Sequence, residues 1–315
     1  MLIFSFFFLA NARESVYIFQ MQIICTLFMK KIIPVIALLL SLCSCSESKT
    51  EKVIYTSFYP IYDFTKRIVG DRFDVVNITP YGSEPHDYEP KARDIVKMTT
   101  CTALFINGLG LEGYASILPD ELAKKTYTVS DGITTMKIDN VIDPHIWLSL
   151  DNAKEEMKNI LSIMKDIDPD NASYYQDNYE YQAKRFDALK NEYVERFSKV
   201  ESRYVVVSHA AFGYLCDEYG LEQVYVSGLS PDDEPTAKSL EKIISLVKER
   251  HISTIFYEEL VSNEISKKIA TETGVKTATL NPLEGLSEEE SKSEDYLSVM
   301  KKNYDLILEA LHDTV

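Results

Sequence analysis

The sequence predicts an α/β protein in which two parallel-sheet βα lobes are joined by one long backbone helix. Short apolar runs alternate with helical patterns from Lys52 onward, and the alternation starts again after residue 200. Strands that alternate with helices form βαβ units, which pack as parallel sheets covered on both faces. A length of 315 residues also fits two domains of about 150 residues each.

The first half contains three runs of strand length that are rich in β-branched and aromatic residues: Val53–Ser57, Phe73–Thr79 and Ala103–Asn107. Such residues favour the pleated, half-buried surface of a sheet. The spacing of apolar residues between and after these runs predicts helices over Tyr62–Val69, Asp94–Met98 and Leu111–Leu118.

A strongly periodic segment separates the two halves. A first helix is predicted over Asn152–Ile167, where Asp168-Pro169 ends it. Large side chains then recur at spacings of 3 and 4, at Tyr175, Tyr179, Gln182, Phe186, Leu189, Tyr193 and Phe197. This is one face of a single helix over Asn171–Val200, which would be about 45 Å long. We expect its aromatic stripe to pack in the core.

The second half repeats the βα pattern. Strands are predicted over Tyr204–Ser208, Gln223–Ser227, Thr254–Tyr257 and Lys276–Leu280. Helices are predicted over Ala210–Tyr219, Pro235–Glu249, Ser262–Thr273 and Asp295–His312. The predicted division of the chain is therefore a leader over 1–45, an N-terminal lobe over 46–170, a connecting helix over 171–200 and a C-terminal lobe over 201–315.

The leader carries the features of a secretory signal peptide. Two lysines follow Met29, an apolar run of about ten residues comes next, and Ser41-Leu42-Cys43-Ser44-Cys45 ends it. The run is too short to cross a bilayer, which takes about 20 apolar residues. Its end resembles the lipobox of bacterial lipoproteins, with Cys45 as the acylated residue. This predicts an extracytoplasmic protein that is lipid-anchored to the cytoplasmic membrane.

Residues 1–28 precede what already resembles a complete signal peptide. We interpret them as a start codon placed too early, with Met29 as the true initiator. The alternative is an additional membrane anchor, because Leu2–Ala10 and Val16–Phe28 are apolar. N-terminal sequencing of the precursor would separate the two.

The charge and the cysteine content of the chain exclude some classes of protein. The net charge is −16, so the chain lacks the basic surface that nucleic-acid binding requires. An acidic chain does lower the cost of holding a cation. Five cysteines are present without a CxxC pair or a disulfide framework. We expect no disulfide between Cys101 and Cys216, and we expect Cys216 to pack inward as a small apolar side chain.

Three of the five histidines occupy loops or strand ends, as candidate metal ligands should. His86 follows the second predicted strand, His145 lies in Asp143-Pro144-His145 just before a helix, and His209 follows the strand that begins the second half. Ligands bind at the carboxyl ends of parallel strands, and imidazole is the commonest metal ligand. We predict a shared metal site, with nearby acids (Glu84, Asp87 and Asp143) orienting the imidazoles. His251, at a charged helix end, and His312 are poorer candidates.

Seven short motifs make the chain resemble a known family. They are Glu84–Pro90 (EPHDYEP), Asn107–Glu112 (NGLGLE), Asp143–Leu148 (DPHIWL), Ser208–Tyr214 (SHAAFGY), Gly228–Pro231 (GLSP) with Glu234-Pro235, Phe256–Glu259 (FYEE) and Leu280–Leu286 (LNPLEGL). In this order, behind a lipobox, they resemble the metal-binding class of ABC-transporter solute-binding lipoproteins, and within it the zinc branch. The resemblance covers roughly residues 52–312.

The resemblance implies that one metal lies between two metal-binding lobes. It implies His86 and His145 as ligands from the first lobe and His209 from the second, with Glu284 or a water as the fourth ligand. Manganese-type relatives have a carboxylate in place of the third His and an Asp at the position of Asn281. A His-rich loop of many zinc-branch members is missing here, because Thr126–Ile142 contains no histidine.

The function implied is capture of Zn²⁺ and its delivery to the permease and ATPase subunits of an ABC importer, by a monomer. A manganese-binding member of the same class is the alternative. A zinc hydrolase or lyase would share the three His but keep an open coordination position, and neither HExxH nor GxSxG is present. An adhesin is also compatible with the fold and the surface location. Trp147, beside His145, is expected to be core or pocket wall.

Overall fold

A computed structural model describes residues 52–258 and 264–312. The predicted signal peptide, Cys45 and the alternative starts lie outside the described residues. Residues 50–315 form one compact unit, and the description below concerns this unit alone. Within the described residues, no helix combines the length and the apolar character that crossing a membrane requires.

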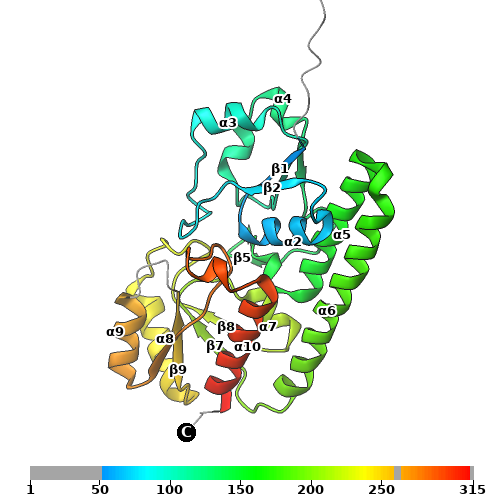
Figure 1. The fold of residues 1–315 in the computed structure, drawn as a ribbon. Helices are drawn as coiled ribbons and strands as arrows, with labels where there is room; N and C mark the ends of the chain where they lie inside the picture. Colours follow the sequence, from blue (N-terminus) through cyan, green and yellow to red (C-terminus); the bar gives the residue numbers. More distant parts are fainter. Residues whose placement is uncertain (1–51, 259–263, 313–315) are drawn as a thin grey trace, which may run out of the picture. The chain divides into compact units, whose positions relative to one another are not determined.

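The first sheet has four parallel strands in the order β2-β1-β3-β4. They are β1 (Val53–Thr56), β2 (Asp74–Asn77), β3 (Ala103–Ile106) and β4 (Thr126–Thr128). Helices α2 (Tyr59–Val69), α3 (Ala92–Met98) and α4 (Asp120–Ala123) belong to the same half (Figure 1). Every residue of β3 is buried, as a central strand of a covered parallel sheet requires.

The predicted helix over Leu111–Leu118 is wrong. Only Gly113–Ile117 are helical there, and they form a 3₁₀ helix. The left-handed residues Gly108, Leu109 and Gly110 precede this helix and Pro119 follows it, so a longer α-helix does not form.

A short hairpin of β5 (Lys137–Ile138) and β6 (Val141–Ile142) was not predicted. Its turn residues Asp139 and Asn140 both have positive φ, which matches a two-residue type I′ turn.

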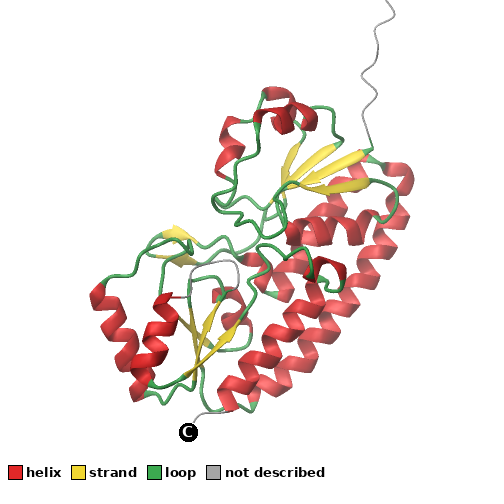
Figure 2. Ribbon diagram, turned by 60° about the vertical axis from the view of Figure 1, so that its left-hand side comes forward, coloured by secondary structure: helices red, strands yellow, loops and turns green. Residues whose placement is uncertain are grey.

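The two predicted central helices are confirmed. Helix α5 (Leu150–Ile167) begins at Ser149, whose hydroxyl caps it by accepting from Asn152 N. Helix α6 (Ala172–Ser198) has 27 residues and is about 40 Å long; it lies beside α5 in both ribbon views (Figures 1 and 2). The aromatic stripe of α6 is buried as expected, at Tyr175, Phe186, Tyr193 and Phe197.

The second sheet is also parallel, in the order β10-β9-β7-β8. Its strands are β7 (Tyr204–Val207), β8 (Glu222–Tyr225), β9 (Thr254–Tyr257) and β10 (Lys276–Thr279). Its helices are α7 (Gly213–Glu218), α8 (Ala237–Glu249), α9 (Glu264–Thr273) and α10 (Tyr296–His312). Helix α7 begins later than predicted because the residues after His209 form a turn, in which Ala211 N donates to His209 O.

Polar and apolar contacts join the two halves. One hydrophobic cluster contains Ile54 and Phe105 of the first sheet as well as Val205 and Phe256 of the second. The guanidinium of Arg67 on α2 donates to Gln182 on α6 and to Asp295 beside α10. The described halves therefore share a continuous core, and separating them would expose apolar surface.

Candidate metal centre

Four side chains meet at the carboxyl ends of the strands. His86 lies in the loop after β2, and His145 lies in the turn between β6 and α5. His209 lies two residues after β7, and Glu284 follows β10 in the loop that leads to α10. One donor atom from each of the four lies within 4.8 Å of the others. The structure thus brings together all four residues that the sequence analysis named.

Four of the six distances between the donor atoms match the edges of a tetrahedron. Glu284 Oε1 lies 3.4 Å from His86 Nε2, 3.0 Å from His145 Nε2 and 3.3 Å from His209 Nε2. The Nε2 atoms of His86 and His145 are 3.1 Å apart. Ligands at the Zn–N and Zn–O distances of about 2.0–2.1 Å lie about 3.3 Å apart at the corners of a tetrahedron. These four distances are therefore those expected between the ligands of one zinc ion.

The site is buried and its polar atoms face inward. The side chains of His145 and His209 are fully buried, that of Glu284 is 2% exposed and that of His86 is 12% exposed. His209 Nε2 and Glu284 Oε1 have no well-aligned hydrogen-bond partner among the described residues. Buried polar atoms without partners are costly, and a cation bound between them would satisfy both.

Carboxylates orient two of the three imidazoles. Asp143 Oδ1 lies 2.7 Å from His145 Nδ1, as the sequence analysis expected. Glu258 Oε1 lies 2.6 Å from His209 Nδ1 and accepts from Ser208 Oγ. Each contact places the proton on Nδ1 and leaves Nε2 free to bind a metal.

The third imidazole lacks such a partner. Glu84 accepts from the backbone N of His86 rather than from its ring. Among the described residues, Asp87 also makes no hydrogen bond to any of the three rings, so the expectation that Glu84 and Asp87 orient imidazoles is wrong. The role of Glu258 was missed, although it stands in the FYEE motif. The sequence signal that could have identified Glu258 was its position directly after the predicted strand Thr254–Tyr257. In the structure this strand, β9, pairs with β7.

Neighbouring charges shift the pKa values of the metal-free site. Burial alone would lower the pKa of His145 and of His209. The carboxylates of Asp143 and Glu284 outweigh burial and raise the pKa of His145. Those of Glu258 and Glu284 do the same for His209. Burial alone would raise the pKa of Glu284, but the three imidazoles beside it, His209 first among them, hold that pKa well below its usual range. Burial and the neighbouring Glu284 raise the pKa of Glu84 to about 9. Glu284 is therefore the charged one of this pair of acids.

A turn with left-handed residues supports the His145 segment. Glu112 accepts from the backbone N of Asn107 and of Gly108, and Asn107 Nδ2 donates to Pro144 O. Gly108 has φ +81°, and a Cβ there would lie 2.5 Å from Thr128 Cγ2, so only glycine fits. The NGLGLE motif thus braces the residue that precedes His145.

Trp147 makes a specific contact that the sequence analysis did not expect. Its indole Nε1 donates to Pro282 O over 2.8 Å, which joins the His145 turn to the loop of Glu284. Asn281 lies outside the donor cluster, where its side chain accepts from Leu283 N and donates to Glu290. Asn281 therefore shapes the turn that presents Glu284.

The remaining candidates lie away from this cluster. His251 is exposed in a left-handed conformation just after α8, and His312 ends α10. Cys101 and Cys216 are free and buried, so the expectation of no disulfide between them is confirmed.

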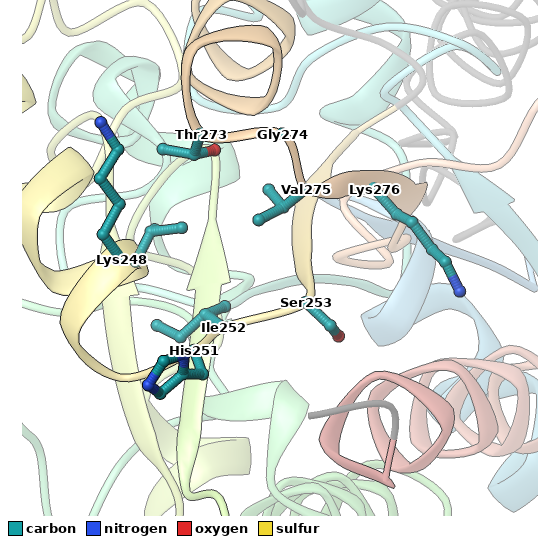
Figure 3. A pocket seen from close by; sticks show the side chains of 9 residues that line it. Lys248, His251, Ile252, Ser253, Thr273, Gly274, Val275 and Lys276 are labelled. Carbon is teal, nitrogen blue, oxygen red and sulfur yellow. The ribbon is translucent and has the colours of Figure 1, made fainter. Parts of the chain in front are cut away.

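A cavity of about 610 Å³ lies at the amino ends of β9 and β10 (Figure 3). Its ionisable lining residues are Lys248, His251 and Lys276, which do not suit a cation.

Glu258 should contribute to metal affinity although it is not placed as a ligand. Replacing Glu258 with Ala removes the acceptor that holds His209 Nδ1, and loss of such a partner typically costs about 10- to 100-fold in metal affinity. A chelator-competition titration would measure it. Glu195→Ala, which removes an exposed acid on α6 that accepts from Lys199, is the control and should bind metal like the parent. Equal affinities for all three proteins would contradict the assignment of Glu258.

Comparison with known proteins finds relatives over most of the chain. The family model described as zinc-uptake complex component A, periplasmic, matches residues 54–310. The high-affinity zinc uptake system protein ZnuA of Bacillus subtilis is 36% identical over 286 residues, which cover 84% of this chain and 90% of that protein. The zinc-binding lipoprotein AdcA of Streptococcus pneumoniae is 35% identical over 88% of this chain, which spans only 59% of its length.

Solved structures resemble the chain along nearly their whole length. The Zn(II)-bound ZnuA-like domain of Streptococcus pneumoniae AdcA matches with a TM-score of 0.74 and 35% identity, covering 83% of this chain and 99% of that one. The laminin-binding protein Lmb of Streptococcus agalactiae matches with a TM-score of 0.77 and 32% identity, covering 82% of this chain and 99% of that one. It is described as a bifunctional protein with adhesin and metal transporting activity. The chain therefore belongs to the zinc-uptake complex component A family of solute-binding proteins.

Proposed function

We propose that this protein captures Zn²⁺ outside the cytoplasm and delivers it to an ABC importer, with His86, His145, His209 and Glu284 as the ligands. The observation that carries the proposal is the cluster itself: three imidazole nitrogens and one carboxylate oxygen lie within 4.8 Å of one another, and the oxygen lies 3.0–3.4 Å from each nitrogen. Membership of the zinc-uptake family supports zinc as the cargo.

Zinc would replace protons in this site. The raised pKa values of His145 and His209 favour the protonated rings when no metal is present. A metal ligand must be a neutral imidazole, so binding releases protons. The positive charge of Zn²⁺ then takes the place of the protons on these rings, beside Asp143, Glu258 and Glu284. The exchange keeps the buried charge nearly constant, which lowers the cost of moving the ion out of water.

Full coordination by protein ligands favours a binding protein over an enzyme. A zinc hydrolase or lyase keeps one position open for an activated water. Here Glu284 Oε1 lies within 3.0–3.4 Å of all three imidazole nitrogens, where it would occupy the fourth position. Manganese fits less well than zinc, because it favours more oxygen ligands and a higher coordination number.

The remaining parts of the proposal concern partners and organisation. The permease and ATPase subunits of an importer are the partners we propose, because the family is a component of a zinc-uptake complex. We further propose a monomer divided into a lobe over 46–170, a connecting helix over 171–200 and a lobe over 201–315. Each lobe then contributes two ligands.

Metal titration of purified residues 46–315 tests the function. One equivalent of zinc per chain is expected by elemental analysis, and manganese should be displaced when zinc is added at the same concentration, because zinc exceeds manganese in intrinsic affinity for such donors. Preferential retention of manganese, or no bound metal at all, would overturn the proposal.

Lipid anchoring through Cys45 is proposed from the lipobox resemblance and has its own test. Replacing Cys45 with Ala removes the thiol that would be acylated, so the protein should pass from the membrane fraction to the medium or periplasm. Replacing Cys43 with Ala is the matched control and should leave the protein in the membrane fraction. Membrane retention of the Cys45 variant would favour an anchor within residues 1–28.

A further inference from the structure

The short helix α7 holds the segment that carries His145, although the two come from different halves of the chain. The carboxylate of Glu218, the last residue of α7, accepts from Ser149 Oγ and from the backbone N of Leu150 and Asp151. It thereby caps the first turn of α5, where an acidic group is favourable. This first contact lies just beyond the His145 turn.

A second contact lies just before His145. The hydroxyl of Tyr214, on α7, donates to Asp143 O and accepts from Met136 N, both over 2.8 Å. Asp143 in turn accepts from the backbone N and from Nδ1 of His145. Tyr214 therefore holds the backbone of the residue whose carboxylate orients a proposed zinc ligand, and Tyr214 is only 5% exposed.

Close packing accompanies these bonds. A Cβ on Gly213 would lie 3.1 Å from Asp143 Oδ2, so the start of α7 abuts the carboxylate that orients His145. Helix α7 itself begins four residues after His209. The positions of His145 and His209 are thus tied together by protein contacts that need no metal.

His86 is held differently. No described carboxylate accepts from its ring Nδ1, and its side chain is the most exposed of the four. Its loop is joined to the Glu284 loop through Gly82 N, which donates to Leu286 O. Of the three imidazoles, His86 is the one with the fewest restraints.

We propose that Tyr214 is a positioning residue. It fixes the position of His145 relative to His209 before zinc binds, and it thereby slows the release of bound zinc. The proposal rests on the proposed function, in which these histidines are zinc ligands. Without the hydroxyl, the segment from Met136 to His145 gains freedom in the metal-free protein. Zinc binding then has to remove that freedom, and preorganisation that is lost in this way weakens binding. Affinity differences between related complexes lie mostly in the dissociation rate, so the loss should appear as faster release.

Tyr214→Phe tests the proposal with a closely matched control. A neutral hydrogen bond contributes about 0.5–1.5 kcal/mol, so zinc release to excess EDTA should become about 3- to 10-fold faster. Tyr193→Phe also removes one hydroxyl from a buried ring, where it donates to Asp305 over 2.6 Å. Tyr193 lies on α6, which supplies no proposed ligand, and its variant should release zinc at the parental rate.

Spectra and melting separate positioning from general destabilisation. The absorption of bound Co²⁺ reports ligand geometry and should change in Tyr214→Phe but not in Tyr193→Phe, while the melting temperature of the metal-free protein should fall in both. Glu218→Gln, which weakens the other contact of α7, should also speed release. A parental release rate in Tyr214→Phe, or equally fast release in Tyr193→Phe, would overturn the proposal. Failure of the parent itself to bind zinc would overturn the proposed function instead.

Discussion

Zinc affinity should fall about 100-fold or more when His145 is replaced with Ala. Zinc sites held by four ligands bind with about 10–16 kcal/mol, so one ligand accounts for about 3 kcal/mol, or a factor of about 100 in Kd. His145 is fully buried and its Nε2 lies 3.0 Å from Glu284 Oε1. Water would replace a buried nitrogen poorly there. Competition with a chromophoric chelator would measure the change in Kd.

The matched control for this variant is His251→Ala. His251 is an exposed histidine just after α8, so its loss should leave the Kd unchanged. Removing His145 also leaves Asp143 without its partner, so the melting temperature of the metal-free variant should be recorded beside the Kd. A folded His145→Ala variant that binds zinc like the parent would show that the ligand assignment is wrong.

The sequence predicted the elements that are long or strongly periodic and missed those that are short. The stripe from Tyr175 to Phe197 identified α6, because seven side chains on one helical face leave no alternative period. Strand β4 has three residues and each hairpin strand has two, which is too short for any alternation to be visible. Their existence depends on pairing with distant strands rather than on local pattern.

In the candidate site, too, residues with a local sequence pattern were predicted, and contacts between distant segments were missed. Three histidines could be chosen from the sequence because each stands beside turn-forming residues at the end of a strand or before a helix. Asp143 was found as an orienting acid because it is two residues from His145. Glu258 was missed because its contact with His209 spans 49 positions and requires β9 to lie beside β7. The Trp147–Pro282 bond spans 135 positions and has no local signal.

Replacing His209 with Glu should weaken zinc binding and shift metal preference toward manganese. The change exchanges a nitrogen donor for a carboxylate, and oxygen donors suit manganese better than zinc. Asn281 need not change for the shift to appear, since its side chain is engaged with Leu283 and Glu290 rather than with the donor cluster. The ratio of the two Kd values should move toward manganese by about tenfold or more.

The structure adds a condition to this exchange, because the new carboxylate would stand beside Glu258. That acid lies 2.6 Å from His209 Nδ1, and two carboxylates at such a distance favour uptake of a proton that competes with the metal. The double variant with Glu258→Gln should therefore bind manganese more tightly than His209→Glu alone, while His209→Gln, which adds no charge, should gain no manganese affinity. Parallel titrations with both metals at one pH would measure all three variants. If His209→Glu kept the parental preference with and without Glu258→Gln, the donor at position 209 would not determine which metal this protein selects.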